Sequence, residues 1–128
     1  MKLELFTLCD FAQENNGKLT IVGTFDTIAA RAFPCFHPSL MVVIRLRFDL
    51  WEFGTHRFTI EVRDIEGKHM IEPLQGSIDV RSVGNATAVS HVLFSLQNFA
   101  LPAPGLASFT LYVDEKEIGT LPLYIKKA

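Results

Sequence analysis

The sequence predicts an all-β fold, an antiparallel β-sandwich of about seven to nine strands with an immunoglobulin-like or C2-like arrangement. Apolar residues recur at every second position in most segments, as in strands that bury one face. No segment of helical length shows a 3.6-residue period without also fitting period two, and six prolines punctuate the chain. With 128 residues, the chain is expected to form a single domain over residues 1–128.

The first element is a strand in which Leu3 and Leu5 alternate with charged residues. The alternation breaks in residues 6–15, and Asp10 is a residue type that often begins a helix. This segment is therefore expected to contain a single helical turn. An Asn-Asn-Gly turn then leads into a second strand, residues 19–25.

Period two is clearest in the middle of the chain. The even positions from Leu40 to Phe48 are all apolar and alternate with Arg45 and Arg47 in the second half of the run. Residues 58–62 alternate apolar with polar or charged side chains, and Gly54 lies between the two runs. The two runs are expected to pair as an antiparallel hairpin. Shorter alternating runs at residues 78–80 and 92–96 predict two further strands.

The chain is expected to close with a hairpin, in which residues 109–113 and 121–125 flank a polar turn, Asp114 to Glu117. The strands together should enclose one core. Its expected members are Ile21, Phe25, Val42, Ile44, Leu46, Phe58, Ile60, Val62, Phe94, Leu96, Phe109, Leu111 and Leu123.

Composition and charge argue against several partners. A net charge of −2 provides no field that would attract a phosphate backbone, so no nucleic-acid partner is expected. The longest apolar run, Leu40 to Ile44, is far shorter than the roughly 20 residues of a membrane-spanning helix, so no membrane association is expected. Without a continuous apolar leader segment, the predicted location is cytoplasmic.

Cys35 and His37 are the nearest approach to a catalytic pair. In an extended segment their side chains point the same way, as a nucleophilic thiol and its base would. No third residue that would orient the histidine is evident, and cysteine is commonly a small buried apolar residue. Cys9 and Cys35 are expected to be unlinked thiols. An enzymatic or metal-binding site near Cys35 and His37 stays open as the alternative function.

No cofactor is predicted from the sequence. The four histidines, at positions 37, 56, 69 and 91, show none of the short spacings of zinc ligands. The acidic clusters lie at turns and do not match a calcium loop. The glycines are scattered and form no phosphate-binding loop.

Several short motifs resemble a family of small, uncharacterised bacterial β-sandwich proteins, a domain of unknown function. These motifs are Leu8-Cys9-Asp10-Phe11-Ala12, Gly17-Lys18-Leu19, Gly23, Phe25-Asp26, Asp64-Ile65-Glu66-Gly67 and Pro104-Gly105. The resemblance implies the sandwich fold and a bacterial origin. It implies no reaction or ligand, so no functional residue is carried over.

One strand carries a candidate interaction face. The outward phase of residues 40–48 presents Met41, Val43, Arg45 and Arg47, and Met and Arg are enriched at protein interfaces. Alternatively, the chain's own loops cover the two apolar residues, and the arginines pair across the sheet with Glu61 or Asp79. The sequence favours a noncatalytic binding or assembly module that acts through a sheet face or an edge strand, with a protein partner or a homo-oligomer.

Overall fold

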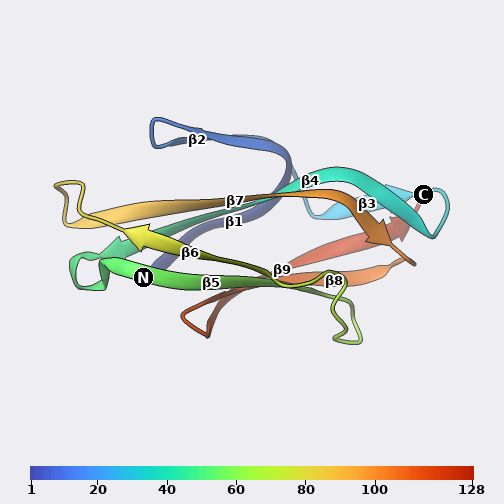
Figure 1. Cartoon of the computed structure of the whole chain (residues 1–128). Helices are drawn as coiled ribbons and strands as arrows, with labels where there is room; N and C mark the ends of the chain where they lie inside the picture. Colours follow the sequence, from blue (N-terminus) through green and yellow to red (C-terminus); the bar gives the residue numbers. More distant parts are fainter.

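The computed structural model describes residues 1–128, which form nine strands in two layers (Figure 1). The strands are β1 (Lys2–Asn15), β2 (Lys18–Phe25), β3 (Thr27–Ala30), β4 (Cys35–Asp49), β5 (Gly54–Arg63), β6 (Leu74–Val80), β7 (Thr87–Leu101), β8 (Gly105–Val113) and β9 (Lys116–Lys127). A short 3₁₀ turn, η1 (Leu50–Glu52), is the only helical element. The predicted all-β sandwich is thus confirmed, and no helix is long and apolar enough to cross a membrane.

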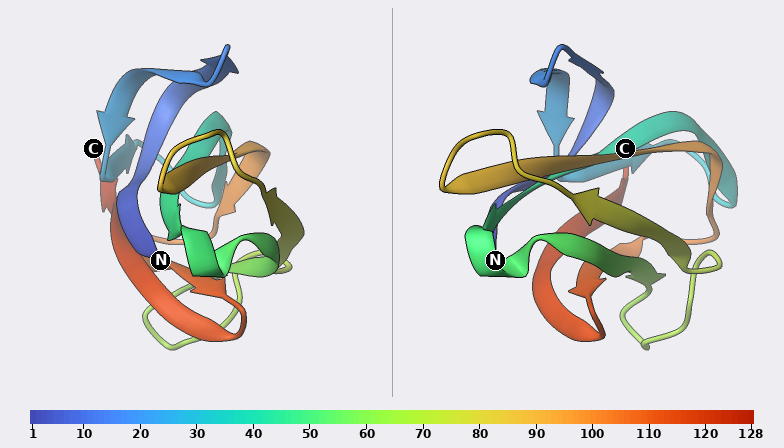
Figure 2. Two further views of the ribbon diagram at one scale, coloured as in Figure 1. Left: turned by 90° about the vertical axis from the view of Figure 1, so that its left-hand side faces the viewer. Right: turned by 60° about the vertical axis from the view of Figure 1, so that its left-hand side comes forward.

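One sheet has the order β2-β1-β4-β7 and the other has the order β3-β9-β8-β5-β6. All neighbouring strands are antiparallel except β3, which pairs in parallel with β9. β3 was not predicted, because its four residues are too few to show a period. Figure 2 shows the two layers packed face to face.

The core between the sheets is one cluster of 22 buried side chains. Most of the predicted core residues belong to it, while Phe25, Phe94 and Leu96 are partly buried and pack against it. Ile21 is the exception, because it packs on the other side of the four-stranded sheet. The period-two pattern therefore predicted which faces meet, except in β2.

The prediction of a helical turn in residues 6–15 is wrong, because β1 continues as a strand to Asn15. The pairing of β1 with β4 shifts register between Leu3 and Leu5. Such a bulge inserts one residue and reverses which side chains face the core. Leu3 and Phe6 therefore both contact the main core, whereas Leu5 lies on the opposite face. In the sequence, this bulge interrupts the alternation of apolar residues, and the interruption looks like the end of the strand.

The prediction that residues 40–48 and 58–62 pair as a hairpin is also wrong. β4 lies in the four-stranded sheet and β5 in the five-stranded sheet, so η1 carries the chain from one layer to the other. Two strands with buried inner faces can either pair side by side or stack face to face. The alternation is the same in both cases, so it did not distinguish them.

The β1–β2 hairpin bends over the outer face of the four-stranded sheet (Figure 1). Asn16 and Gly17 at its tip have φ values of 53° and 76°, as a tight two-residue turn requires. Beneath the hairpin lies a second, smaller cluster of buried residues, Cys9, Ala12 and Val43. This hairpin determines which parts of the outer face stay open.

Candidate functional site

The apolar half of the predicted interaction face lies under the hairpin. Val43 is completely buried, and Met41 is half-buried against the same small cluster. The backbone N–H of Ala12 points at the sulfur of Met41, 3.2 Å away. The covering segment is a strand hairpin of the same chain. Binding through the Met41, Val43, Arg45 and Arg47 face stays a prediction, but only its arginine half is open to solvent.

The two arginines of this face share one carboxylate. Arg45 Nε donates to Glu4 Oε1 at 2.9 Å, and Arg47 Nε donates to Glu4 Oε2 at 2.8 Å. These hydrogen bonds, from Arg47 first and then Arg45, lower the pKa of Glu4 to about 2. The expected partners, Glu61 and Asp79, were wrong because they lie on strands of the other sheet, whereas Glu4 lies on the adjacent strand β1.

A buried histidine ties the hairpin to β7. His91 Nδ1 lies 2.5 Å from Glu14 Oε1, and Arg45 Nη1 lies 3.0 Å from His91 Nε2. Because a guanidinium only donates, Nε2 accepts and the ring proton sits on Nδ1, which donates to Glu14. The His91 side chain is only 2% exposed. This network holds the hairpin tip over the outer side of β7.

Cys35 and His37 do not share a cavity. Cys35 lines a cavity of about 310 Å³ with Met70 and Leu101, whereas His37 lines a different one with Phe25 and Asp10. Both cysteines are free thiols, Cys9 buried and Cys35 half-buried. No group of three or more His, Cys, Asp or Glu side chains is placed to hold a metal ion. The predicted pair of Cys35 and His37 is therefore not brought together, and Cys35 instead shares its cavity with His69 and Asp64.

The most distinctive open feature is the lateral edge of β7. This strand ends the four-stranded sheet, and its 15 residues pair with β4 along one side only. None of the backbone hydrogen bonds outside the strand ladders involves β7, and no side chain bonds to its backbone. Its outward N–H and C=O groups thus have no partner within the chain.

The other edge strands are all shorter than β7. β3 has four residues and β6 has seven, with Asp79 among them, while β2 begins at Lys18. Short length and charged side chains are the usual means by which natural proteins prevent unwanted strand pairing at an edge. β7 has neither, because residues 87–101 contain no Lys, Arg, Asp or Glu. Its edge is open to a further strand.

A groove of about 460 Å³ follows this edge. Residues 89–94 of β7 form its back wall, Ser77 and Ile78 of β6 with Phe58 of β5 lie on one side, and Glu14 of the hairpin lies on the other. Six of the ten lining residues are apolar, and Glu14 is the one carboxylate among them. The groove has the shape and chemistry of a site for an extended chain segment.

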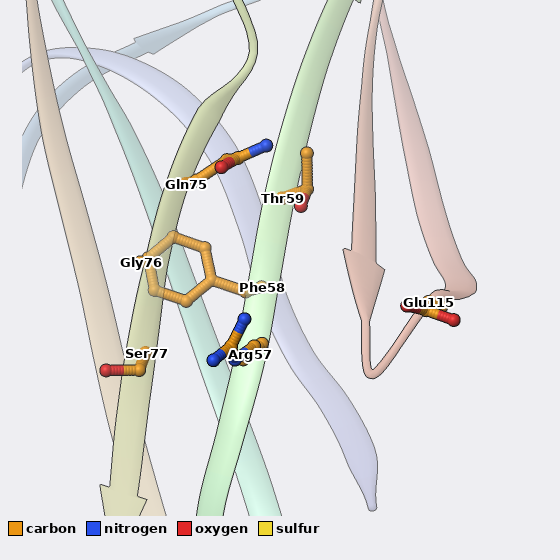
Figure 3. A pocket seen from close by; sticks show the side chains of 7 residues that line it. All are labelled: Arg57, Phe58, Thr59, Gln75, Gly76, Ser77 and Glu115. Carbon is orange, nitrogen blue, oxygen red and sulfur yellow. The ribbon is translucent and has the colours of Figure 1, made fainter.

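A second hollow, of about 500 Å³, adjoins the groove at Phe58 and Ser77. Figure 3 shows the ring of Phe58 reaching from β5 across Gly76 of β6, with Glu115 apart on the β8–β9 turn. A Cβ atom at Gly76 would lie 2.6 Å from Phe58 Cζ, so only glycine leaves room for this ring. The ring also contacts Phe94, with centroids 5.7 Å apart, and so forms part of the groove wall.

Sequence reasoning missed this site. The absence of charge over residues 87–101 was readable, but a continuous uncharged run is equally typical of a central strand. Only the strand order places β7 at an edge.

Comparison with known families agrees with the fold. The model of DUF6941, a family of unknown function, matches residues 4–126. The chain belongs to this family. The DUF6941 match includes all of β7, both sides of the groove and the β1–β2 hairpin. No curated protein matches the chain.

Proposed function

We propose that the protein is a noncatalytic binding module that takes up one extended polypeptide strand along the edge of β7. The observation that carries the proposal is a long strand edge, free of charged side chains, whose backbone groups have no partner in the chain. An added strand forms ladder hydrogen bonds with such an edge, and adjacent pockets select its alternate side chains.

The groove defines the chemistry of the strand that fits. Side chains on one face of the added strand would lie against Ile78 and Phe58, so apolar residues suit alternate positions. Side chains on the opposite face would lie toward Glu14, whose side chain is 45% exposed and favours a polar or basic neighbour. The expected ligand therefore alternates apolar residues with polar or basic ones.

The test uses a displayed library of random 12-residue peptides, selected against the full chain. Selected peptides should show the alternating pattern. Ser77→Trp should weaken their binding at least tenfold, because Ser77 is an exposed groove residue and the indole fills the space. Gln75→Trp is the matched control, since Gln75 is exposed on the same strand but lies outside the groove.

Circular dichroism and thermal melts should show both tryptophan variants folded. Peptides that bind Ser77→Trp as well as the wild type would exclude the groove as the binding site. A selection that yields no binder to the monomeric protein would count equally against the proposal.

A further inference from the structure

We infer that the strand taken up by the β7 edge is β7 of a second copy, so that the two four-stranded sheets join into one across a two-fold axis. This inference rests on the proposed function and names its partner. In such a pairing the two strands run antiparallel, and each residue on one copy opposes a residue of the same face on the other.

The register follows from where β7 is regular. Asn98 has a φ of 51°, which ends the extended geometry, so the regular part is residues 87–97. A two-fold axis at Val92 pairs all eleven of these residues with their counterparts. The residue numbers of any two opposed residues then add up to 184.

Side-chain sizes match in this register. On the inner face Phe94 opposes Ser90 of the second copy, and Leu96 opposes Ala88, so large residues meet small ones. Phe94 and Leu96 are only partly buried in one copy, so pairing would cover the apolar surface that they still expose.

Charge does not oppose the pairing. Residues 87–97 carry no formal charge at neutral pH when His91 is neutral, so the two paired strands carry no like charges of their own, and the nearest carboxylate, Glu14, is hydrogen-bonded to His91 of its own copy. Both ring nitrogens of His91 are already bonded within its own copy, to Glu14 and Arg45. Closed two-fold pairing also removes the exposed edge from both copies, which open-ended addition would not.

Disulfide cross-linking of the full chain tests the register, with Cys35 replaced by Ser. Val89→Cys with Ser95→Cys should give a covalent dimer in mild oxidant, because positions 89 and 95 oppose each other between copies. Within one copy they lie about 20 Å apart along the strand, beyond disulfide reach. Ser95→Cys alone should form no covalent dimer, and Val89→Cys with Gln97→Cys should cross-link less, since that pair belongs to a neighbouring register.

Sedimentation across a concentration series tests the association itself. The wild type should form dimers, and Ser95→Asp should weaken dimerisation at least tenfold because the charge would face Val89 of the second copy. Ser39→Asp is the control, since Ser39 is also exposed but lies on the inner strand β4, opposite Gln97. Equal effects of the two substitutions, or failure of the 89–95 cross-link, would overturn the inference.

The two proposals fail in different ways. A wild type that is monomeric at every concentration, but binds library peptides in a manner blocked by Ser77→Trp, refutes the second copy as partner and leaves strand uptake standing. A monomer without such peptide binding refutes both.

Discussion

At the residue scale, a single glycine determines how the groove wall is built. Gly76 opposes Phe58 in the β5–β6 pairing, and the Phe58 ring occupies the space that a side chain at position 76 would need. The ring in turn contacts Phe94 of the other sheet. Gly76 thereby connects the edge strand β6 to the packing between the layers.

We predict that Gly76→Ala destabilises the protein, although alanine loses less backbone entropy than glycine on folding. The new methyl group would displace the Phe58 ring, and overpacking of this kind costs about 1–3 kcal/mol. Denaturant unfolding measures the change. Gly105→Ala is the control because no atom lies within 4 Å of its Cβ position, and an equal loss in both variants would contradict the explanation.

A second residue-scale feature is His56, whose two ring nitrogens both face acceptors. Nδ1 donates to Asp114 Oδ2 and Nε2 donates to the carbonyl oxygen of Glu52, both at 2.6 Å. Burial, the largest single influence, disfavours the charged ring. The hydrogen bonds to Asp114 and Glu52, with their charges, together outweigh it and raise the pKa of His56. The same contact lowers the pKa of Asp114.

We predict that His56→Gln lowers stability more at pH 5.5 than at pH 9. Because the pKa of His56 is higher in the folded protein, the charged ring stabilises the fold fully at pH values below the pKa of the unfolded state, about 6.5. This stabilisation is lost as the pH rises through the pKa of the folded state. At pH 5.5 the Asp114 carboxylate is still ionised. Urea unfolding at the two pH values provides the comparison with wild type. A pH-independent loss for His56→Gln would argue against the charged ring.

At the scale of elements, the β1–β2 hairpin has two roles. It covers Val43 and Met41, which would otherwise be an apolar patch on the outer face, and it forms one side of the β7 groove through Glu14. Its contacts are a small apolar cluster and the hydrogen bond from His91 to Glu14. A cluster of this size holds an element less firmly than the main core does.

We predict that Val43→Ala loosens the hairpin more than it loosens the five-stranded sheet. The lost methyl groups and the cavity they leave cost about 1–3 kcal/mol. Native-state hydrogen exchange should show faster exchange at amides of β2 than in β8. Val22→Ala is the control on the same hairpin, because Val22 is 53% exposed and its truncation should change little. Uniform acceleration across both sheets would mean that the hairpin does not open separately.

At the scale of the whole molecule, stability resides in the two-layer core. Ile60 of β5 is completely buried in the main cluster. We predict that Ile60→Ala costs about 2–5 kcal/mol, the usual range for truncating a buried aliphatic side chain. Denaturant unfolding checks this value against Ile65→Ala, where the side chain is 75% exposed and a change within about 0.5 kcal/mol is expected. A small loss at position 60 would show that the core is not as tightly packed as the structure has it.

The sequence by itself determined the fold class and most of the core. Period two fixes which side chains share a face of a strand, and that depends only on backbone geometry, so residues such as Val42, Ile60 and Leu111 were placed correctly. The closing β8–β9 hairpin was equally local, because its strands and turn are contiguous. The motifs pointing to an uncharacterised sandwich family agree with the DUF6941 match.

Only the tertiary structure decided where the candidate site lies. Alternation does not reveal which strands are neighbours, so it could show neither that β4 and β5 lie in different sheets nor that β7 ends one of them. It also could not show that the β1–β2 hairpin bends over Val43, because a strand's neighbour across a face is distant in the chain. The groove along β7 depends on strand order and on four separate segments of the chain, and local periodicity contains information about neither.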